Sequence, residues 1–161
     1  CGATLRLYDM PSGTVCGSTA DVEDARQVCG RLGMRHYVFH FTGEFEREVI
    51  GRFAEGYACG GTPNPCICCN RYIKFGRLLE QAREMGFDHL ATGHFARVEF
   101  DEQRGRWLLK KAKDPGKDQT YVLYSLSQEA LSHSLFPMGE LYKSEGRTLA
   151  MTRGPGHLFC P

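Results

Sequence analysis

The order of apolar segments along the chain predicts an α/β fold in which helices cover a parallel sheet. Short apolar runs of strand length alternate with longer segments in which apolar residues recur every three or four positions. A helix between two strands lets both strands run in the same direction. The 161 residues are enough to enclose one hydrophobic core, and in this architecture ligands lie beyond the carboxyl ends of the strands.

The first third of the chain is predicted to form two strand–helix pairs. In order, the expected elements are a strand at 3–8, a Gly/Ser/Thr-rich loop at 11–19, a helix at 20–32, a strand at 36–41 and a helix at 45–58. Ser18 or Thr19 is the expected N-cap of the first helix, and Gly33 its stop. The predicted inner faces carry Val22, Ala25, Val28 and Cys29 in the first helix and Phe45, Val49, Ile50, Phe53 and Tyr57 in the second.

The middle of the chain predicts a third helix with clear start and stop signals. Asn64 is a good N-cap, and Pro65 suits the first helical position because its missing N–H is not needed there. Gly86 closes the element. Its apolar residues at helical spacing are Phe75, Leu78, Leu79 and Ala82.

The second half predicts one more strand, a hairpin and two helices. The strand covers residues 89–92 and ends at Gly93-His94. Residues 96–100 and 107–111 are expected to pair as a β-hairpin around a polar turn. Residues 119–126 and 128–134 are interpreted as helical, and no internal repeat is present.

The start of the third helix carries three cysteines, Cys66, Cys68 and Cys69. At about 100° per residue, Cys68 falls nearly in line with Phe75 on the buried stripe, while Cys69 lies about 120° away. We therefore interpret Cys68 as structural and Cys69 as facing a cleft. The positive end of the helix dipole, with Arg71 and Lys74 nearby, favours the reactive thiolate of Cys69.

Two other interpretations of these cysteines stay open. A cysteine near a helix start is often a small buried apolar residue. The Cys66-x-x-Cys69 spacing also suits zinc, but Cys16, Cys29 and Cys59 are solitary and supply no second ligand pair. We expect no metal site here.

Charge and hydropathy exclude little about partners. The 20 basic and 19 acidic residues nearly cancel, which neither supports nor excludes RNA binding, because a local patch matters more than the sum. The sequence has no apolar run of about 18 residues and no signal-peptide pattern at its start, so no membrane span is expected. Adjacent Cys68 and Cys69 favour a reducing, cytoplasmic environment over a disulfide-rich secreted one.

Five blocks of sequence resemble the tRNA-specific 2-thiouridylases, which place sulfur on the wobble uridine of certain tRNAs. The blocks occur in the order and at the spacing of that family, and the resemblance covers most of residues 1 to about 150. They are Gly61-Thr62-Pro63-Asn64-Pro65, Cys69-Asn70-Arg71-Tyr72-Ile73-Lys74-Phe75, Ala91-Thr92-Gly93-His94-Phe95-Ala96-Arg97, Lys117-Asp118-Gln119-Thr120-Tyr121 and Leu135-Phe136-Pro137-Met138-Gly139.

This resemblance implies a fold and a chemistry. The fold is that of the adenine nucleotide α-hydrolases, similar to PP-loop ATPases: an incomplete catalytic α/β domain at residues 1–136 with a β-hairpin insertion, then a linker and the start of a truncated central domain at 137–161. The cysteine matching Cys69 receives a persulfide and delivers its sulfur to an ATP-activated uridine. ATP with Mg²⁺, tRNA and a persulfide donor from a cysteine desulfurase relay are the implied cofactors and partners.

The resemblance also implies binding residues. Gly93 and His94, at a strand end, are expected beside the nucleotide, although a lone histidine is often structural. The lysines of the 113–119 turn suit backbone phosphates, and Gln119 can read a base edge. An ordinary charged loop is the alternative there. The residues expected to contact tRNA are Asn70, Arg71, Lys74, Arg97, Lys117, Asp118 and Gln119.

Several features depart from the family. Cys66 stands where some members carry an aspartate, and Phe95 replaces a tyrosine. The family's Ser-Gly-Gly-x-Asp-Ser loop is expected before Cys1, and its second catalytic cysteine beyond residue 161, so no role is given to Cys160. We expect an internal fragment that is inactive alone. The rival hypothesis is a non-catalytic cysteine-rich module that holds zinc or an iron–sulfur cluster and binds RNA.

Overall fold

The computed structural model describes residues 1–7 and 19–153. Its contacts divide the chain into two compact units, residues 1–69 and 70–161. The end of the first predicted strand, most of the 11–19 loop, Ser18 as a possible cap, and Cys160 lie outside the described residues.

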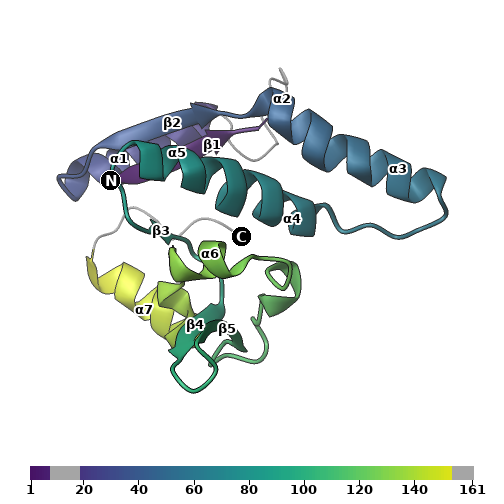
Figure 1. Cartoon of the computed structure of the whole chain (residues 1–161). Coiled ribbons are helices and arrows are strands. Elements are labelled where there is room, and N and C mark those ends of the chain that lie inside the picture. The colour runs from purple at the N-terminus through teal and green to yellow at the C-terminus, as the bar shows by residue number, and fades with distance from the viewer. Residues whose placement is uncertain (8–18, 154–161) are drawn as a thin grey trace. The chain divides into compact units, whose positions relative to one another are not determined.

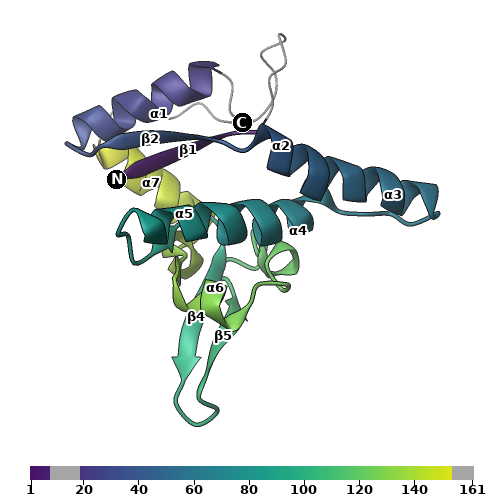
Figure 2. The ribbon, with the colours of Figure 1, turned by 45° about the horizontal axis from the view of Figure 1, so that its top comes forward.

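The first unit begins with the predicted strand–helix–strand. Strands β1 (Gly2–Arg6) and β2 (His36–His40) pair in parallel, with α1 (Thr19–Arg31) between them in sequence. Figure 2 shows α1 lying along the two strands. Gly33 follows the helix with a φ of 65°, a left-handed conformation that suits glycine. The predicted inner face is confirmed, since Val22, Ala25 and Val28 are half-buried and Cys29 is buried.

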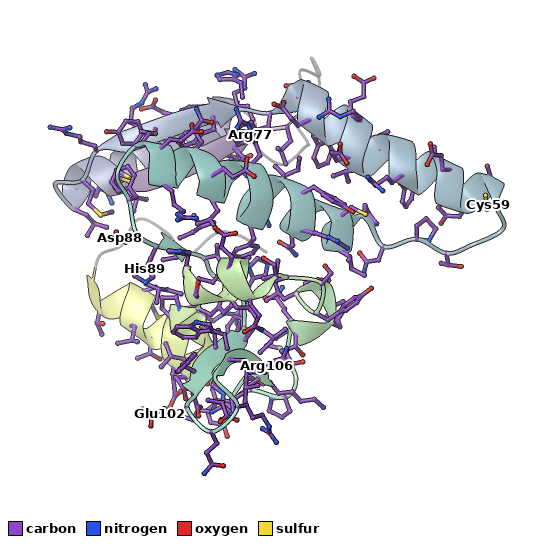
Figure 3. All side chains as sticks on the ribbon, viewed as in Figure 1. Cys59, Arg77, Asp88, His89, Glu102 and Arg106 are labelled. Carbon is purple, nitrogen blue, oxygen red and sulfur yellow. The ribbon has the colours of Figure 1, made fainter. Side chains whose placement is uncertain are left out.

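One long helix follows β2, as Figure 1 shows. It consists of α2 (Thr42–Phe45), a π-helical stretch (Glu46–Gly51) and α3 (Arg52–Ala58), so it starts three residues before the predicted 45. Val49 is buried as predicted, but Tyr57 is 55% exposed. The prediction that Tyr57 belongs to the inner face is therefore wrong, and its ring instead packs on Phe53 with centroids 4.9 Å apart. Figure 3 labels Cys59, which follows the end of α3.

The third predicted helix is also confirmed, from Pro65 to Glu84. It contains α4 (Pro65–Cys68), a π-helical stretch (Cys69–Leu78) and α5 (Leu79–Glu84). Gly86 follows with a φ of 85°. The division between the two units falls within this helix, between Cys69 and Asn70. The sequence did not predict the π-helical stretch.

In its described residues, 70–153, the second unit contains two small sheets. Strand β3 (Leu90–Ala91) pairs in parallel with β6 (Ser134–Leu135). The predicted hairpin is confirmed, because β4 (Ala96–Asp101) pairs antiparallel with β5 (Arg106–Lys111). Figure 3 labels Glu102 and Arg106 at its turn. The α/β class with parallel strands and a hairpin is thus as predicted, and the parallel strands of the described residues form pairs rather than one complete sheet.

The last third departs most from the prediction. Residues 119–126 hold only a 3₁₀ turn (Thr120–Val122), so the predicted helix there is wrong. Helix α6 (Gln128–Ser132) is confirmed, with Ser127 as its cap. A 3₁₀ turn (Pro137–Glu140) and helix α7 (Lys143–Arg153) follow, in the segment expected to hold a linker and the start of a central domain.

The Pro137–Glu140 turn packs on the hairpin. The backbone N–H of Lys113 donates to the carbonyl of Gly139 at 2.8 Å. A Cβ at Gly139 would collide with the carbonyl oxygen of Ala96, so this approach requires glycine. The expected division at residues 136 and 137, with a further domain beginning there, remains a prediction.

Candidate functional site

The cysteine segment forms the first turn of a well-capped helix. Asn64 has extended backbone angles, and its Oδ1 accepts a hydrogen bond from the N–H of Cys66 at 3.0 Å. Pro65 occupies the start of the helix, as predicted. The N–H of Cys69 donates to the carbonyls of Cys66 and Pro65. The backbone of Cys66 and Cys69 is therefore held one turn apart by local interactions.

The three thiols differ in exposure, but not as the helical-wheel argument expected. Cys66 is exposed, whereas Cys68 and Cys69 are both half-buried. The expected difference in burial between Cys68 and Cys69 assumed a rotation of about 100° per residue. The helix becomes π-helical at Cys69, however, and its turns are wider from there on. Burial alone therefore does not separate Cys68 from Cys69, and their structural and catalytic roles remain predictions.

Asn70 lies inside the second unit rather than at its surface. Its side chain is 2% exposed, and its Nδ2 donates to the carbonyl of Val122 at 3.3 Å. A buried amide usually holds neighbouring elements together. The structure has Asn70 joining the helix to the Thr120–Val122 turn, and the expected contact of Asn70 with RNA remains a prediction.

Arg71 and Lys74 have different surroundings. Arg71 is exposed, with its guanidinium 5.2 Å from the ring centre of Tyr72. It lines a hollow of about 330 Å³, at one end of which Arg83 pairs with Glu129 at 2.5 Å. Lys74 is half-buried, and its charge acts on His94.

His94 is packed among aromatic rings just after β3. Its ring centre lies 6.0 Å from that of Phe75 and 6.1 Å from that of Phe136. Its Nδ1 is 2.8 Å from the hydroxyl oxygen of Thr92. Burial, helped by the positive charge of Lys74, lowers the pKa of His94 to about 4. His94 is therefore neutral at pH 7 and suits hydrogen bonding rather than binding an anion by charge.

Four predicted site residues come together in one hollow of about 420 Å³. We call it the Gln119 hollow, and its lining includes Gly93, Lys117, Asp118, Gln119, Tyr121 and Lys143. Two hydrogen bonds join its sides: the N–H of Phe95 donates to Oε1 of Gln119 at 2.9 Å, and the N–H of Gln119 donates to the carbonyl of Phe95 at 2.8 Å. The end of β3 and the Lys-Asp-Gln segment thus form one site.

Asp118 stabilises the wall of the Gln119 hollow. Its Oδ1 accepts from the N–H of Ala112 at 2.8 Å, and its Oδ2 accepts from the hydroxyl of Thr120 at 2.6 Å. Partial burial alone would raise the pKa of Asp118, but these hydrogen bonds and the charge of Lys111 outweigh burial and lower it. Asp118 is an ionised structural acceptor rather than a proton-transfer group.

Arg97 is engaged within the hairpin. Its Nε donates to the carbonyl of Lys111 at 2.8 Å, and its Nη1 lies 3.6 Å from a carboxylate oxygen of Glu140. Arg97 does not line the Gln119 hollow. Four lining residues were absent from the predicted site: Phe95, Gly116, Tyr121 and Lys143. Tyr121 follows the Lys-Asp-Gln segment directly, which is a usable signal, whereas Lys143 is distant in sequence and had none.

The described residues contain neither a cluster of metal ligands nor a membrane-spanning helix. In residues 1–7 and 19–153, no three His, Cys, Asp or Glu side chains gather closely enough to hold a metal ion. The zinc or iron–sulfur hypothesis thus has no ligand cluster in this part of the chain. No helix in the same residues is long and apolar enough to cross a membrane.

Comparison with known proteins identifies the family. The model of the tRNA methyl transferase HUP domain matches residues 1–156. The chain belongs to this family. The fold class predicted from the sequence agrees with this membership.

The curated relatives carry a more specific name. The tRNA-specific 2-thiouridylase MnmA of Symbiobacterium thermophilum is 55% identical over 140 residues, covering 86% of this chain and 36% of the relative. The protein of the same name from Moorella thermoacetica is 48% identical over 158 residues, which cover 95% of this chain and 44% of that relative. The resemblance drawn from the five sequence blocks is thereby confirmed. The chain spans less than half the length of these relatives.

Proposed function

We propose that this chain is part of an enzyme that transfers sulfur to C2 of the wobble uridine of tRNA. The observation that carries the proposal is the identity of 48–55% to proteins named tRNA-specific 2-thiouridylase, extending over 86–95% of the chain. The matched segment includes the capped cysteine turn and the Gln119 hollow. By itself, we expect the chain to be inactive.

Cys69 is the proposed sulfur carrier. Its terminal persulfide sulfur attacks C2 of the activated uridine, a C2–S bond forms, and the C2–O bond breaks with AMP as the leaving group. A second thiol then attacks the Sγ of Cys69, so that the S–S bond breaks and the outer sulfur stays on C2. The capped first turn supports this role because it holds the Cys69 backbone in place near the positive end of the helix dipole, which favours a sulfur anion.

ATP with Mg²⁺ is proposed to supply the adenylyl group that activates the C2 oxygen. Gly93 suits a place beside the nucleotide, because it lines the Gln119 hollow and, apart from its chain neighbours, no residue comes within 4 Å of the position that a Cβ would occupy. His94, neutral at pH 7, would donate or accept a hydrogen bond there.

The proposed RNA contacts divide into direct and indirect ones. Lys117 and Arg71 are exposed and suit phosphates, and Gln119 keeps its amide nitrogen for a base edge while its oxygen binds the Phe95 backbone. Asp118 and Asn70 act as positioning residues through their hydrogen bonds. Lys74 and Arg97 would add positive charge near the RNA backbone. The proposed sulfur source is a persulfide from a cysteine desulfurase relay, and the proposed location is the cytoplasm.

Measurement of 2-thiouridine tests this function. Cys69→Ser, made in the protein that contains this chain, should abolish 2-thiouridine in tRNA, because serine cannot carry the transferred sulfur. Cys68→Ser is the matched control and should leave thiolation in place. Nucleoside mass spectrometry of the tRNA measures both. Normal 2-thiouridine in the Cys69→Ser strain would overturn the assignment.

A further inference from the structure

The Thr120–Val122 turn presents one aromatic side chain to solvent from a firmly anchored backbone. Tyr121 is 62% exposed, while the next two residues, Val122 and Leu123, are 4% and 0% exposed. The turn is closed by hydrogen bonds from the N–H of Val122 to the carbonyl of Gln119 and from the N–H of Leu123 to the carbonyl of Thr120. The backbone of this turn thus holds a large aromatic ring in contact with water, although the hydrophobic effect favours burial of such a ring.

The position of Tyr121 distinguishes it from other exposed aromatic residues. Tyr121 lines the Gln119 hollow, whose volume of about 420 Å³ is within the range of small-molecule sites. Tyr124, three residues later, is 69% exposed but lines neither this hollow nor the one beside Arg71. Tyr124 can therefore serve as a control for Tyr121, because the two tyrosines have similar exposure and only Tyr121 lines the Gln119 hollow.

The rim of the Gln119 hollow is positively charged and held in shape. Lys117 and Lys143 lie on it, and neither has an ion-pair partner in the described part of the chain. Asp114 fixes the rim, since its Oδ1 accepts from the N–H of Gly116 and its Oδ2 accepts from the N–H of Lys143, both at 3.0 Å. The acidic residue at the hollow, Asp118, already accepts hydrogen bonds from Ala112 and Thr120.

We propose that Tyr121 is a stacking platform for one unpaired RNA base at the Gln119 hollow, with Lys117 and Lys143 contacting the phosphates on either side. An exposed ring beside an amide and two cations matches how proteins bind single-stranded nucleic acid. A protein partner would favour a larger apolar patch and would not need the two cations. The proposal deepens the proposed function by naming a second nucleotide, next to the modified uridine, that the chain holds.

Fluorescence of 2-aminopurine tests the stacking. The probe is an unmodified anticodon stem–loop RNA with 2-aminopurine at the loop positions flanking the wobble uridine, titrated with this chain. Stacking on Tyr121 should quench the fluorescence. Tyr121→Ala should lose the quenching and bind about 5- to 100-fold more weakly. Tyr121→Phe should behave as the wild type, because it keeps the aromatic face.

Two further variants keep the test decisive. Tyr121→Leu keeps apolar bulk without an aromatic face and should lose the quenching like Tyr121→Ala. Tyr124→Ala removes the comparison tyrosine and should change neither quenching nor affinity. Replacing both Lys117 and Lys143 by alanine should make the slope of log affinity against log salt shallower by about 1.4, the value for two contacts to single-stranded phosphates.

The proposal is overturned if Tyr121→Ala or Tyr121→Leu quenches and binds as the wild type, if Tyr124→Ala loses as much as Tyr121→Ala, or if the wild-type chain does not bind the RNA. Fluorescence and affinity are measured without ATP or a persulfide donor, so neither readout requires sulfur transfer by Cys69. Loss of thiolation chemistry and loss of base stacking are therefore separate results, so either proposal can fail without the other.

Discussion

At the scale of single residues, His94 shows how surroundings change chemistry. The sequence predicted that His94 lies at the end of a strand, but it did not predict whether the imidazole is charged. Burial between Phe75 and Phe136 and the nearby cation of Lys74 lower its pKa to about 4. Its ordinary pKa is near 6.5, so His94 stays neutral through the whole physiological range.

The lowered pKa of His94 predicts a loss of stability in mild acid. Between pH 6.5 and 4 the unfolded chain binds a proton at this histidine and the folded chain does not, so stability falls as the pH falls through this window. From pH 7 to 5 the contribution is about 1 kcal/mol once solvent screening is allowed for. Urea unfolding at both pH values, on the wild type and on His94→Gln, measures it. An equal loss in both proteins would contradict the lowered pKa.

Residue types were predicted better than residue environments. The sequence identified Gly93, Lys117, Asp118 and Gln119, and the structure places all four at one hollow. It did not show that Asn70 is buried, because burial depends on the distant turn at Val122 to which Asn70 donates a hydrogen bond. Tyr121 was not predicted as a site residue. A tyrosine must be exposed to contact a ligand, and the local sequence does not show whether a side chain is exposed.

At the scale of elements, the helix start at Asn64 is the feature that sequence described best. A cap and a proline at the first position act within a few residues, so their signal is local. The structure confirms both, with Asn64 accepting from Cys66 at 3.0 Å. The π-helical stretch from Cys69 was not predicted, because i to i+5 bonding has no comparable sequence signal.

Removal of the cap should weaken this helix start. Asn64→Ala leaves the N–H of Cys66 without its acceptor and should lower the free energy of unfolding by about 1 kcal/mol. Asn64→Asp, which keeps an acceptor oxygen, is the control and should be close to the wild type. Denaturant unfolding measures the stability, and amide exchange at Cys66 localises the effect. Unchanged exchange at Cys66 in Asn64→Ala would show that the cap does not hold the turn.

Short elements set the limit of prediction from sequence. Strand β6 has two residues, which is too few for a periodic pattern, and its pairing with β3 defines it. Residues 119–126 carry apolar residues at helical spacing, yet only a 3₁₀ turn forms there. Val122 and Leu123 are buried, and the tyrosines on either side of them are exposed. In both places tertiary contacts decide the conformation.

At the scale of the whole molecule, fold class and family were predictable because many weak signals agreed. Alternating strands and helices gave the α/β class, and five sequence blocks in order gave the resemblance that the HUP-domain match over residues 1–156 confirms. The two compact units, 1–69 and 70–161, were not predicted, since their division falls inside a continuous helical pattern. The chain spans only 36–44% of the length of the two relatives compared above.

The account depends on Cys69 accepting sulfur, and mapping of the persulfide tests this most directly. The chain is incubated with a persulfide donor and alkylated, and the tryptic peptide covering residues 53–71, which contains Cys59, Cys66, Cys68 and Cys69, is fragmented by mass spectrometry. We predict one additional sulfur on Cys69, absent in Cys69→Ser and retained in Cys68→Ser. Additional sulfur on Cys66 or Cys68 with Cys69 unmodified, or none on any of the four, would contradict the account.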